Sequence, residues 1–237
     1  MDCRVSVCIP TYNGARYIRR QLESILSQLG EDDEVIISDD SSMDETIDVI
    51  RSIRDSRVQL FCGNTFHSPI FNMENALMHA RGEYIFMADQ DDVWLGNKVA
   101  DVLPLLKEYD LVVTDCQVTD AQEKVVVPSY FQLIHSGKGF WKNLCKNTYI
   151  GCCMAFKRNV LDFVIPFPKS IPMHDSWIAL NVEYRNGSVM FYDRPCMLYR
   201  RHGDNASTSS EKSQRTFSQK LLDRWNLLFH VLKRSIK

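Results

Sequence analysis

The sequence has no excess of charge of one sign. Its 28 Lys and Arg residues nearly balance 30 Asp and Glu residues, which gives a net charge of −2. A protein that binds a phosphate backbone needs an excess of cations, so this balance argues against a nucleic-acid partner. With 237 residues, 45% of them hydrophobic, the chain can bury one large core. We therefore expect a single domain with an extension.

Signs of export and membrane insertion are also lacking. No run of eighteen apolar residues occurs, and the N-terminus enters a strand without the basic region and cleavage site of a secretion signal. The eight cysteines include no CxxC pair, and the adjacency of Cys152 and Cys153 is awkward for a disulfide framework. Together these absences predict a cytoplasmic protein whose cysteines are ordinary reduced core residues.

A dense acidic segment follows an apolar one in the middle of the chain. Residues 84–88 have the length and composition of a buried strand, and Asp89, Gln90, Asp91 and Asp92 follow directly. Carboxylates this close repel one another and raise one another's pKa unless a cation lies among them. Oxygen ligands suit Mg²⁺ or Mn²⁺. The alternative is a solvated turn in which Asp91 or Asp92 caps a helix that begins near Asn97.

Strands and helices alternate over the first ninety residues. This alternation predicts an α/β fold with a parallel sheet, helices on both of its faces and right-handed crossovers. In such sheets the ligand lies beyond the carboxyl ends of the strands, where residues 10–14, 39–40 and 89–92 would meet. The predicted strands are 4–10, 34–38, 58–62 and 84–88, and the predicted helices are 16–29, 45–53 and 69–79.

The second half is less regular. Residues 132–147 are predicted to be helical or irregular, and His174 and Asp175 precede a predicted helix at 178–184. Taken alone, this pair of residues is best explained as a helix cap. The predicted strands are 111–115, 125–127, 149–156 and 189–191.

Several blocks together resemble the inverting family 2 glycosyltransferases of the GT-A fold. They are CIPTYNGARYI, VIISDDSSMDET, ENALMHARGEYIFMADQDDVW, MHDSW and YRRHGDN, and the similarity covers roughly residues 4–205. The motif DQDDVW at residues 89–94 resembles that of rhamnosyltransferases in particular. Ser41 departs from the pattern, since the family often has glycine there. The resemblance implies a GT-A domain at 1–205 with a Rossmann-like, mostly parallel sheet, followed at 206–237 by a flexible loop and a C-terminal helix.

The resemblance also implies roles for individual residues. Asp175 matches the general base, which takes the proton from the acceptor hydroxyl. Asp91 and His202 match ligands of a Mg²⁺ or Mn²⁺ ion. The implied nucleotide-binding residues are Pro10, Thr11, Tyr12, Asp39, Asp40 and Asp89, and the implied donor and acceptor pocket contains Gly151, Cys152, His174, Trp177, Arg200 and Arg201.

The implied activity is transfer of a sugar, with inversion, from a nucleotide diphosphate sugar to a glycan or lipid-linked saccharide. Bacterial surface polysaccharide synthesis is the expected setting. The first donor expected is dTDP-rhamnose, with UDP-galactose, UDP-glucose and UDP-GlcNAc open. Two alternatives come from other classes: a non-catalytic sugar nucleotide binding protein, and a Mg²⁺-dependent receiver module that would end near residue 120.

Residues 217–236 form an amphipathic pattern with basic residues around it. Two interpretations are open for this predicted helix. It can pack on the domain, or it can lie on the anionic inner face of the cell membrane, as a lipid-linked acceptor would require.

Overall fold

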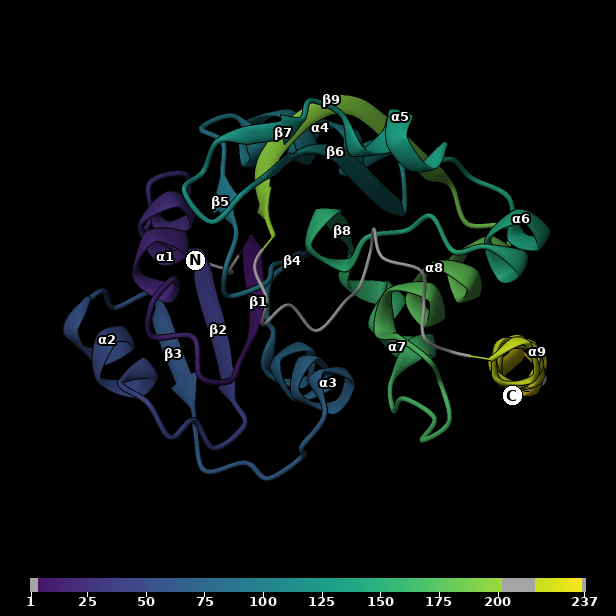
Figure 1. The fold of residues 1–237 in the computed structure, drawn as a ribbon, viewed down its shortest axis with the longest axis horizontal. Coiled ribbons are helices and arrows are strands. Elements are labelled where there is room, and N and C mark those ends of the chain that lie inside the picture. Colours follow the sequence, from purple (N-terminus) through teal and green to yellow (C-terminus); the bar gives the residue numbers. More distant parts are fainter. Residues whose placement is uncertain (1–3, 202–215, 236–237) are drawn as a thin grey trace.

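Nine strands join into one mixed sheet in the computed structural model, which describes residues 4–201 and 216–235 (Figure 1). Their order across the sheet is β3-β2-β1-β4-β8-β6-β9-β5, with β7 paired to β6. The expected α/β architecture is confirmed. The strands are β1 (Val5–Thr11), β2 (Glu34–Asp39), β3 (Val58–Phe61), β4 (Tyr84–Met87), β5 (Val93–Trp94), β6 (Leu111–Thr119), β7 (Val125–Val127), β8 (Met154–Lys157) and β9 (Val189–Arg200).

The first four strands form the parallel part of the sheet, as predicted. Helices α1 (Ile18–Leu26) and α2 (Thr46–Ser52) carry the chain outward from β1 to β3, and α3 (Pro69–His79) carries it back to β4. Right-handed crossovers place outward and returning helices on opposite faces, so both faces of this half are covered (Figure 1). The carboxyl ends of β1, β2 and β4 consequently meet at one edge.

The second half extends the same sheet. Strand β8 lies antiparallel between β4 and β6, and β9 runs parallel to β6. The sheet is continuous through Arg200, which excludes a receiver module that ends near residue 120. The other helices are α4 (Lys98–Glu108), α5 (Tyr130–Ile134), α6 (Phe140–Cys145), α7 (Leu161–Val164), α8 (His174–Tyr184) and α9 (Phe217–Ser235), with 3-10 turns η1 (Gly151–Cys153) and η2 (Arg158–Val160).

The structure corrects two boundaries near the site. Residues 149–156 were expected as one strand, but the chain makes the turn η1 before β8 begins at Met154. A Cβ on Gly151 would lie 2.9 Å from His174 Nε2, so the turn brings backbone, with no side chain, against that ring. The helix predicted at 178–184 begins four residues earlier, which places His174 and Asp175 in the first turn of α8.

Helix α9 packs against α6 and α8 through a buried side that includes Leu227 and Val231 (Figure 1). No helix among residues 4–201 and 216–235 combines the length and the apolar character needed to cross a membrane. His202 and most of the loop expected before α9 lie outside the described residues, so their predicted roles stay predictions.

Candidate active site

Asp39, the first of the carboxylates predicted to bind nucleotide, connects the ends of β1 and β2 through hydrogen bonds. It is fully buried, and Thr11 Oγ1 donates a hydrogen bond to it at 2.8 Å. Ser42 donates to the same carboxylate from its backbone amide at 2.9 Å and from its hydroxyl at 2.6 Å. Asp39 therefore holds the loop after β2 in place.

The neighbouring Asp40 organises a second loop. The backbone amides of Phe66 and Ser68 donate to its two carboxylate oxygens at 2.6 and 3.0 Å. Asp40 also lines a pocket together with His67 and Ser68. Of the two adjacent acids predicted to bind nucleotide, it is Asp40 that borders this pocket.

Gln90 ties the acidic turn to the loop after β1. Its side-chain amide accepts from Tyr12 N at 2.9 Å and donates to Tyr12 O at 3.0 Å. Gly14 leaves room for this pairing, because a Cβ there would lie 2.3 Å from Gln90 Oε1. These hydrogen bonds join the two loops, and Tyr12, which is half exposed, lines the pocket.

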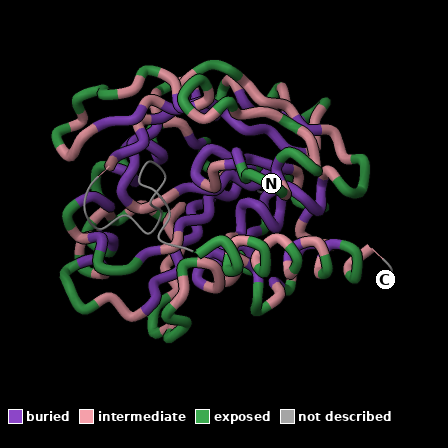
Figure 2. The backbone as a smooth tube through the Cα atoms, turned by 45° about the vertical axis from the view of Figure 1, so that its right-hand side comes forward, coloured by how far each residue is buried: buried purple, intermediate pink, exposed green. Residues whose placement is uncertain are grey.

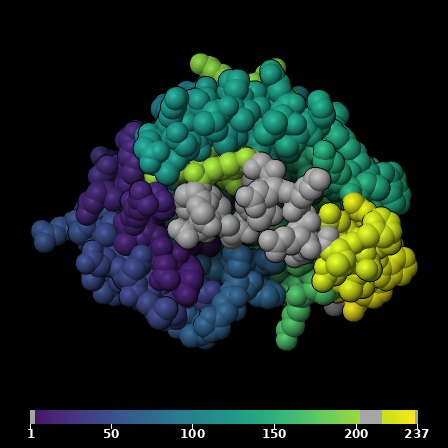
Figure 3. All heavy atoms as spheres, viewed as in Figure 1, coloured from purple at the N-terminus to yellow at the C-terminus, as the bar shows by residue number. Residues whose placement is uncertain are grey.

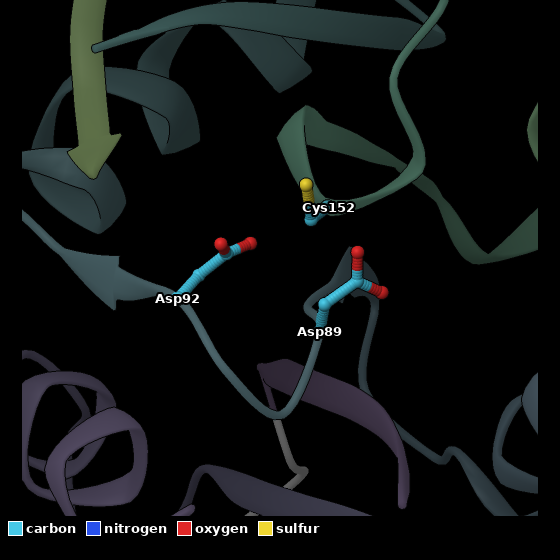
Figure 4. Close-up of side chains that lie close together, drawn as sticks. All are labelled: Asp89, Asp92 and Cys152. Carbon is cyan, nitrogen blue, oxygen red and sulfur yellow. The ribbon is translucent and has the colours of Figure 1, made fainter. Parts of the chain in front are cut away.

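The acidic turn gathers three carboxylates in a buried place. Burial, and then the charge of Asp91, raises the pKa of Asp89 to about 7. Burial and the charges of Asp91 and Asp89 raise the pKa of Asp92 well above its usual range. The side chains of Asp89 and Asp92 point from the two arms of the turn toward Cys152 (Figure 4). One ligand atom from each of Asp89, Asp92 and Cys152 lies within 4.8 Å of the other two.

This chemistry fits a hard divalent cation. Among residues 4–201 and 216–235, no ion pair joins Asp89 or Asp92 to a lysine or arginine. A cation between the carboxylates would remove the repulsion that raises their pKa values. The hydrogen bond with Cys153, then burial and the charges of Asp92 and Asp89, raise the pKa of the Cys152 thiol, which keeps it protonated and a poor ligand. Asp89 and Asp91 both line the pocket, whereas Asp92 does not.

A buried lysine holds the 3-10 turn η1. Lys98 is fully buried at the first position of α4, where its Nζ donates to Cys152 O at 2.7 Å and lies 4.4 Å from the Trp94 ring centroid. A cation at a helix N-terminus opposes the helix dipole. The hydrogen bond from Lys98 to the Cys152 carbonyl of η1 accounts for a lysine at this position.

Replacing Lys98 with Met is expected to lower the free energy of unfolding by about 1–3 kcal/mol, because the buried Cys152 carbonyl loses its donor while the side-chain stem keeps its packing. Urea denaturation measures this effect. Lys107→Met, at an exposed position of the same helix, is the matched control. Equal midpoints for the two variants would show that the bond to Cys152 contributes nothing.

The predicted base, Asp175, also lines this pocket. Asp175 is 8% exposed, and burial raises its pKa to about 6 although Ser176 N and the Asn147 side chain donate hydrogen bonds to it. Burial lowers the pKa of the neighbouring His174 to about 4, so this ring is neutral at pH 7. The charge of Asp175 also reaches Asp89 and contributes to its raised pKa. A carboxylate that titrates near pH 6 is suited to accepting a proton.

These walls enclose one pocket of about 680 Å³. Asp89, Gln90 and Asp91 form one part of it, and Asp175 with His174 forms another. The other lining residues are Pro10, Thr11, Tyr12, Asp40, His67, Ser68, Pro69, Asn72, Tyr130, Ile134, Lys146, Asn147, Tyr149, Ile150, Gly151, Met173 and Tyr199.

The family profile described as Glycosyl transferase family 2 matches residues 6–164, more than half of the chain. The chain belongs to glycosyltransferase family 2. The match agrees with the observed sheet, and the GT-A type fold expected from the sequence is confirmed.

Relatives of this family 2 glycosyltransferase include the Escherichia coli UDP-Glc:alpha-D-GlcNAc-diphosphoundecaprenol beta-1,3-glucosyltransferase WfgD. The two are 26% identical over 215 residues, which cover 89% of this chain and 82% of WfgD. Among solved structures, S. aureus TarS in complex with UDP-GlcNAc has a TM-score of 0.70 at 18% identity, covering 98% of this chain and 66% of that one.

A second solved structure is the mannosyltransferase PcManGT from Pyrobaculum calidifontis in complex with GDP-Man and Mn²⁺. Its TM-score is 0.62 at 20% identity, covering 100% of this chain and 65% of that one. At these identities the two solved structures share the fold. This chain spans about two thirds of the length of each.

Several residues predicted for the site of this glycosyltransferase lie elsewhere. Trp177 is fully buried in the core and donates from Nε1 to Val164 O at 2.9 Å, so it does not line the acceptor side. Arg200 Nη2 donates to Glu123 at 2.7 Å and its guanidinium lies over the Tyr17 ring, which directs it away from the pocket. Asp39, Cys152 and Arg201 are also absent from the described pocket lining.

Sequence reasoning missed other residues of the site. Asn147 both lines the pocket and donates to Asp175, and Gln90 joins the acidic turn to the loop after β1. Lys98 left a signal that could have been used, since lysine is unusual in the first turn of a helix. Asn147 left none, because it lies in a stretch predicted only as helical or irregular.

Proposed function

We propose that this chain transfers a hexose, with inversion, from a UDP-sugar to a hydroxyl group of a lipid-linked saccharide. One observation carries the proposal: Asp175, with its pKa raised to about 6, shares a 680 Å³ pocket with the carboxylates of Asp89 and Asp91. A proton acceptor on one wall and an acidic group on another are what a one-step displacement of a diphosphate needs.

The nucleoside would lie along residues 10–12 and Asp40. Tyr12 offers an exposed ring for the base, and the Gln90 pairing fixes its backbone. Asp89 and Asp91 would hold the divalent ion beside the diphosphate. A bound Mg²⁺ or Mn²⁺ would neutralise charge on the departing nucleoside diphosphate.

Asp175 would accept the proton of the attacking acceptor hydroxyl. Its carboxylate is ionised above about pH 6, and the hydrogen bonds from Ser176 N and Asn147 fix its orientation. The neutral His174 ring can hydrogen-bond a sugar hydroxyl without competing for the proton. Attack on the face opposite the diphosphate inverts the anomeric carbon in one step.

UDP-glucose is the first donor to test, because WfgD is named for UDP-Glc and TarS was solved with UDP-GlcNAc. The donor expected from the DQDDVW motif, dTDP-rhamnose, has no support among these relatives. It is tested beside the UDP-sugars as a comparison. The acceptor class follows the name of WfgD, which acts on a diphosphoundecaprenol-linked GlcNAc.

Donor hydrolysis tests the activity directly. The panel contains UDP-glucose, UDP-GlcNAc, UDP-galactose and dTDP-rhamnose, each with and without Mn²⁺. We expect turnover of a UDP-hexose in the presence of Mn²⁺ and little in the presence of a chelator. Absence of both binding and turnover for every donor, in either condition, would overturn the proposal. Binding without turnover, even with a polyprenol-linked acceptor, would favour a non-catalytic sugar nucleotide binding protein.

A further inference from the structure

Helix α9 uses one side to pack on the domain and leaves large apolar side chains on the other. Leu227 and Val231 are buried, whereas Trp225 is 65% exposed and Phe229 is 50% exposed. Helical spacing puts Trp225 and Phe229 four residues apart on the outward side. We call this outward side the aromatic face. Its exposed members are Leu221, Leu222, Trp225, Phe229 and Leu232.

Burial alternates along this helix in Figure 2, where α9 runs toward the C-terminus with exposed segments between intermediate and buried ones. A helix with a purely structural role would present polar residues to water. An apolar stripe of this extent on a terminal helix indicates a docking surface.

The neighbouring helix α6 adds to this region. It packs beside α9 at the same end of the molecule (Figures 1 and 3), and its Trp141 is 68% exposed. Tryptophan is enriched where a protein meets the headgroup region of a bilayer, because its ring is apolar with one polar edge.

The two segments that form this region are rich in basic residues. Residues 137–148 and 216–235 contain seven Lys and Arg residues and one acid, Asp223, although the whole chain carries a net charge of −2. Lys138, Lys142, Lys146 and Lys233 are exposed. Cations of this density beside an apolar face match an anionic lipid surface, and they disfavour a second copy of the same face, which would bring like charges together.

The region also adjoins the pocket. Lys146 directly follows α6 and lines the pocket, and α6 itself packs against α9. A saccharide attached to a lipid could therefore reach the pocket while its lipid stays in the bilayer.

We propose that the aromatic face of α9, with Trp141 and the surrounding lysines, binds the surface of an anionic bilayer. The choice of a lipid over a protein partner rests on the lipid-linked acceptor of the proposed function. The face enters the headgroup boundary, and the cations contact lipid phosphates.

Vesicle flotation of the whole chain tests this proposal. We expect binding to phosphatidylcholine vesicles that contain phosphatidylglycerol, weaker binding without phosphatidylglycerol and loss of binding at high salt. The double variant Trp225→Ser/Phe229→Ser should lower the partition coefficient by about tenfold or more, because two large apolar side chains no longer enter the interface. Lys142→Gln and Lys233→Gln should each weaken binding to the anionic vesicles by about fivefold.

The matched control is Met78→Ser/Val126→Ser, at positions 63% and 56% exposed on α3 and β7. It should bind like the unaltered chain. Failure of the unaltered chain to bind anionic vesicles, or equal binding by the double variant, would overturn the proposal. So would light scattering that shows a dimer dissociated by Trp225→Ser/Phe229→Ser without vesicle binding.

Donor hydrolysis in the absence of vesicles separates this proposal from the activity. The double variant should hydrolyse donor at the rate of the unaltered chain, because the aromatic face lines no part of the pocket. Hydrolysis without vesicle binding would reject the membrane surface alone. Vesicle binding without any donor turnover would reject the proposed activity alone.

Discussion

Replacing Asp175 with Asn is expected to abolish sugar transfer and to stabilise the protein at the same time. The variant keeps the shape of the side chain but cannot accept a proton, so kcat should fall by about 10²–10⁴-fold. The affinity for donor should change little. Isothermal titration with UDP and Mn²⁺, together with a coupled transfer assay, measures the two quantities.

The stability gain follows from the raised pKa of Asp175. Its pKa is about 6 in the folded protein, against an ordinary value of 3.8, so ionisation of the buried carboxyl opposes folding. The penalty is absent below about pH 4, develops as pH rises toward 6 and is constant above. We therefore expect Asp175→Asn to raise the free energy of unfolding at pH 8 by about 1–3 kcal/mol and to leave it unchanged at pH 4.

The same pKa sets the pH dependence of transfer. Because the base must be ionised, kcat/KM should rise with pH, reach half its maximum near pH 6 and level off at higher pH. His174 should add no limb to this profile near neutrality, since burial holds its pKa at about 4. Asn147→Asp offers a useful comparison, because it removes the donor to Asp175 and should move the rising limb to higher pH. Equal loss of transfer and donor affinity in Asp175→Asn would assign this residue a binding role.

Asp91→Asn should have the next largest effect. Asp91 lines the pocket, and its substitution is expected to lower transfer by about 10²–10³-fold, to weaken donor binding and to remove stimulation by Mn²⁺. These effects are measured by transfer rates across a Mn²⁺ titration and by calorimetry with UDP.

Asp92→Asn is the matched control for Asp91. The Asp92 carboxylate accepts from Arg200 N at 3.0 Å, lies close to Cys152 and does not line the pocket. Its strongly raised pKa also means that the neutral amide resembles its protonated form. Transfer should stay within about tenfold of the unaltered chain. If Asp92→Asn loses as much activity as Asp91→Asn, the ion is held by the Asp89 and Asp92 pair, and our assignment of Asp91 is wrong.

The parallel half of the sheet was predictable because its signals are local. Short apolar runs alternate with periodic segments, and the handedness of crossovers then leaves few arrangements. The meeting of Thr11, Asp39 and Asp89 at one edge followed directly. The antiparallel insertion of β8 between β4 and β6 was not predictable, since no local pattern in residues 154–157 tells which strands will be its neighbours.

The surroundings of individual side chains were harder to predict than the edge of the sheet at which they lie. Asp39 and Asp40 are adjacent, and only the loop at residues 63–68 decides that Asp40 borders the pocket. Arg200 was predicted to lie in the donor and acceptor pocket, but Glu123, far away in the sequence, pairs with it. Trp177 lies two residues from Asp175, yet the turn of α8 directs it into the core. A helix rotates successive side chains by about 100°, so neighbours in sequence face different surroundings.

The amino-acid sequence by itself determined the α/β class, the acidic turn after β4 and the amphipathic character of the last helix, because each depends on residues close together in the chain. Only the tertiary structure decided that Asp175 shares a pocket with Asp89, that Lys98 lies buried against η1 and that α9 leaves its aromatic face exposed. Those facts depend on burial, which is set by contacts between segments separated by as many as a hundred residues.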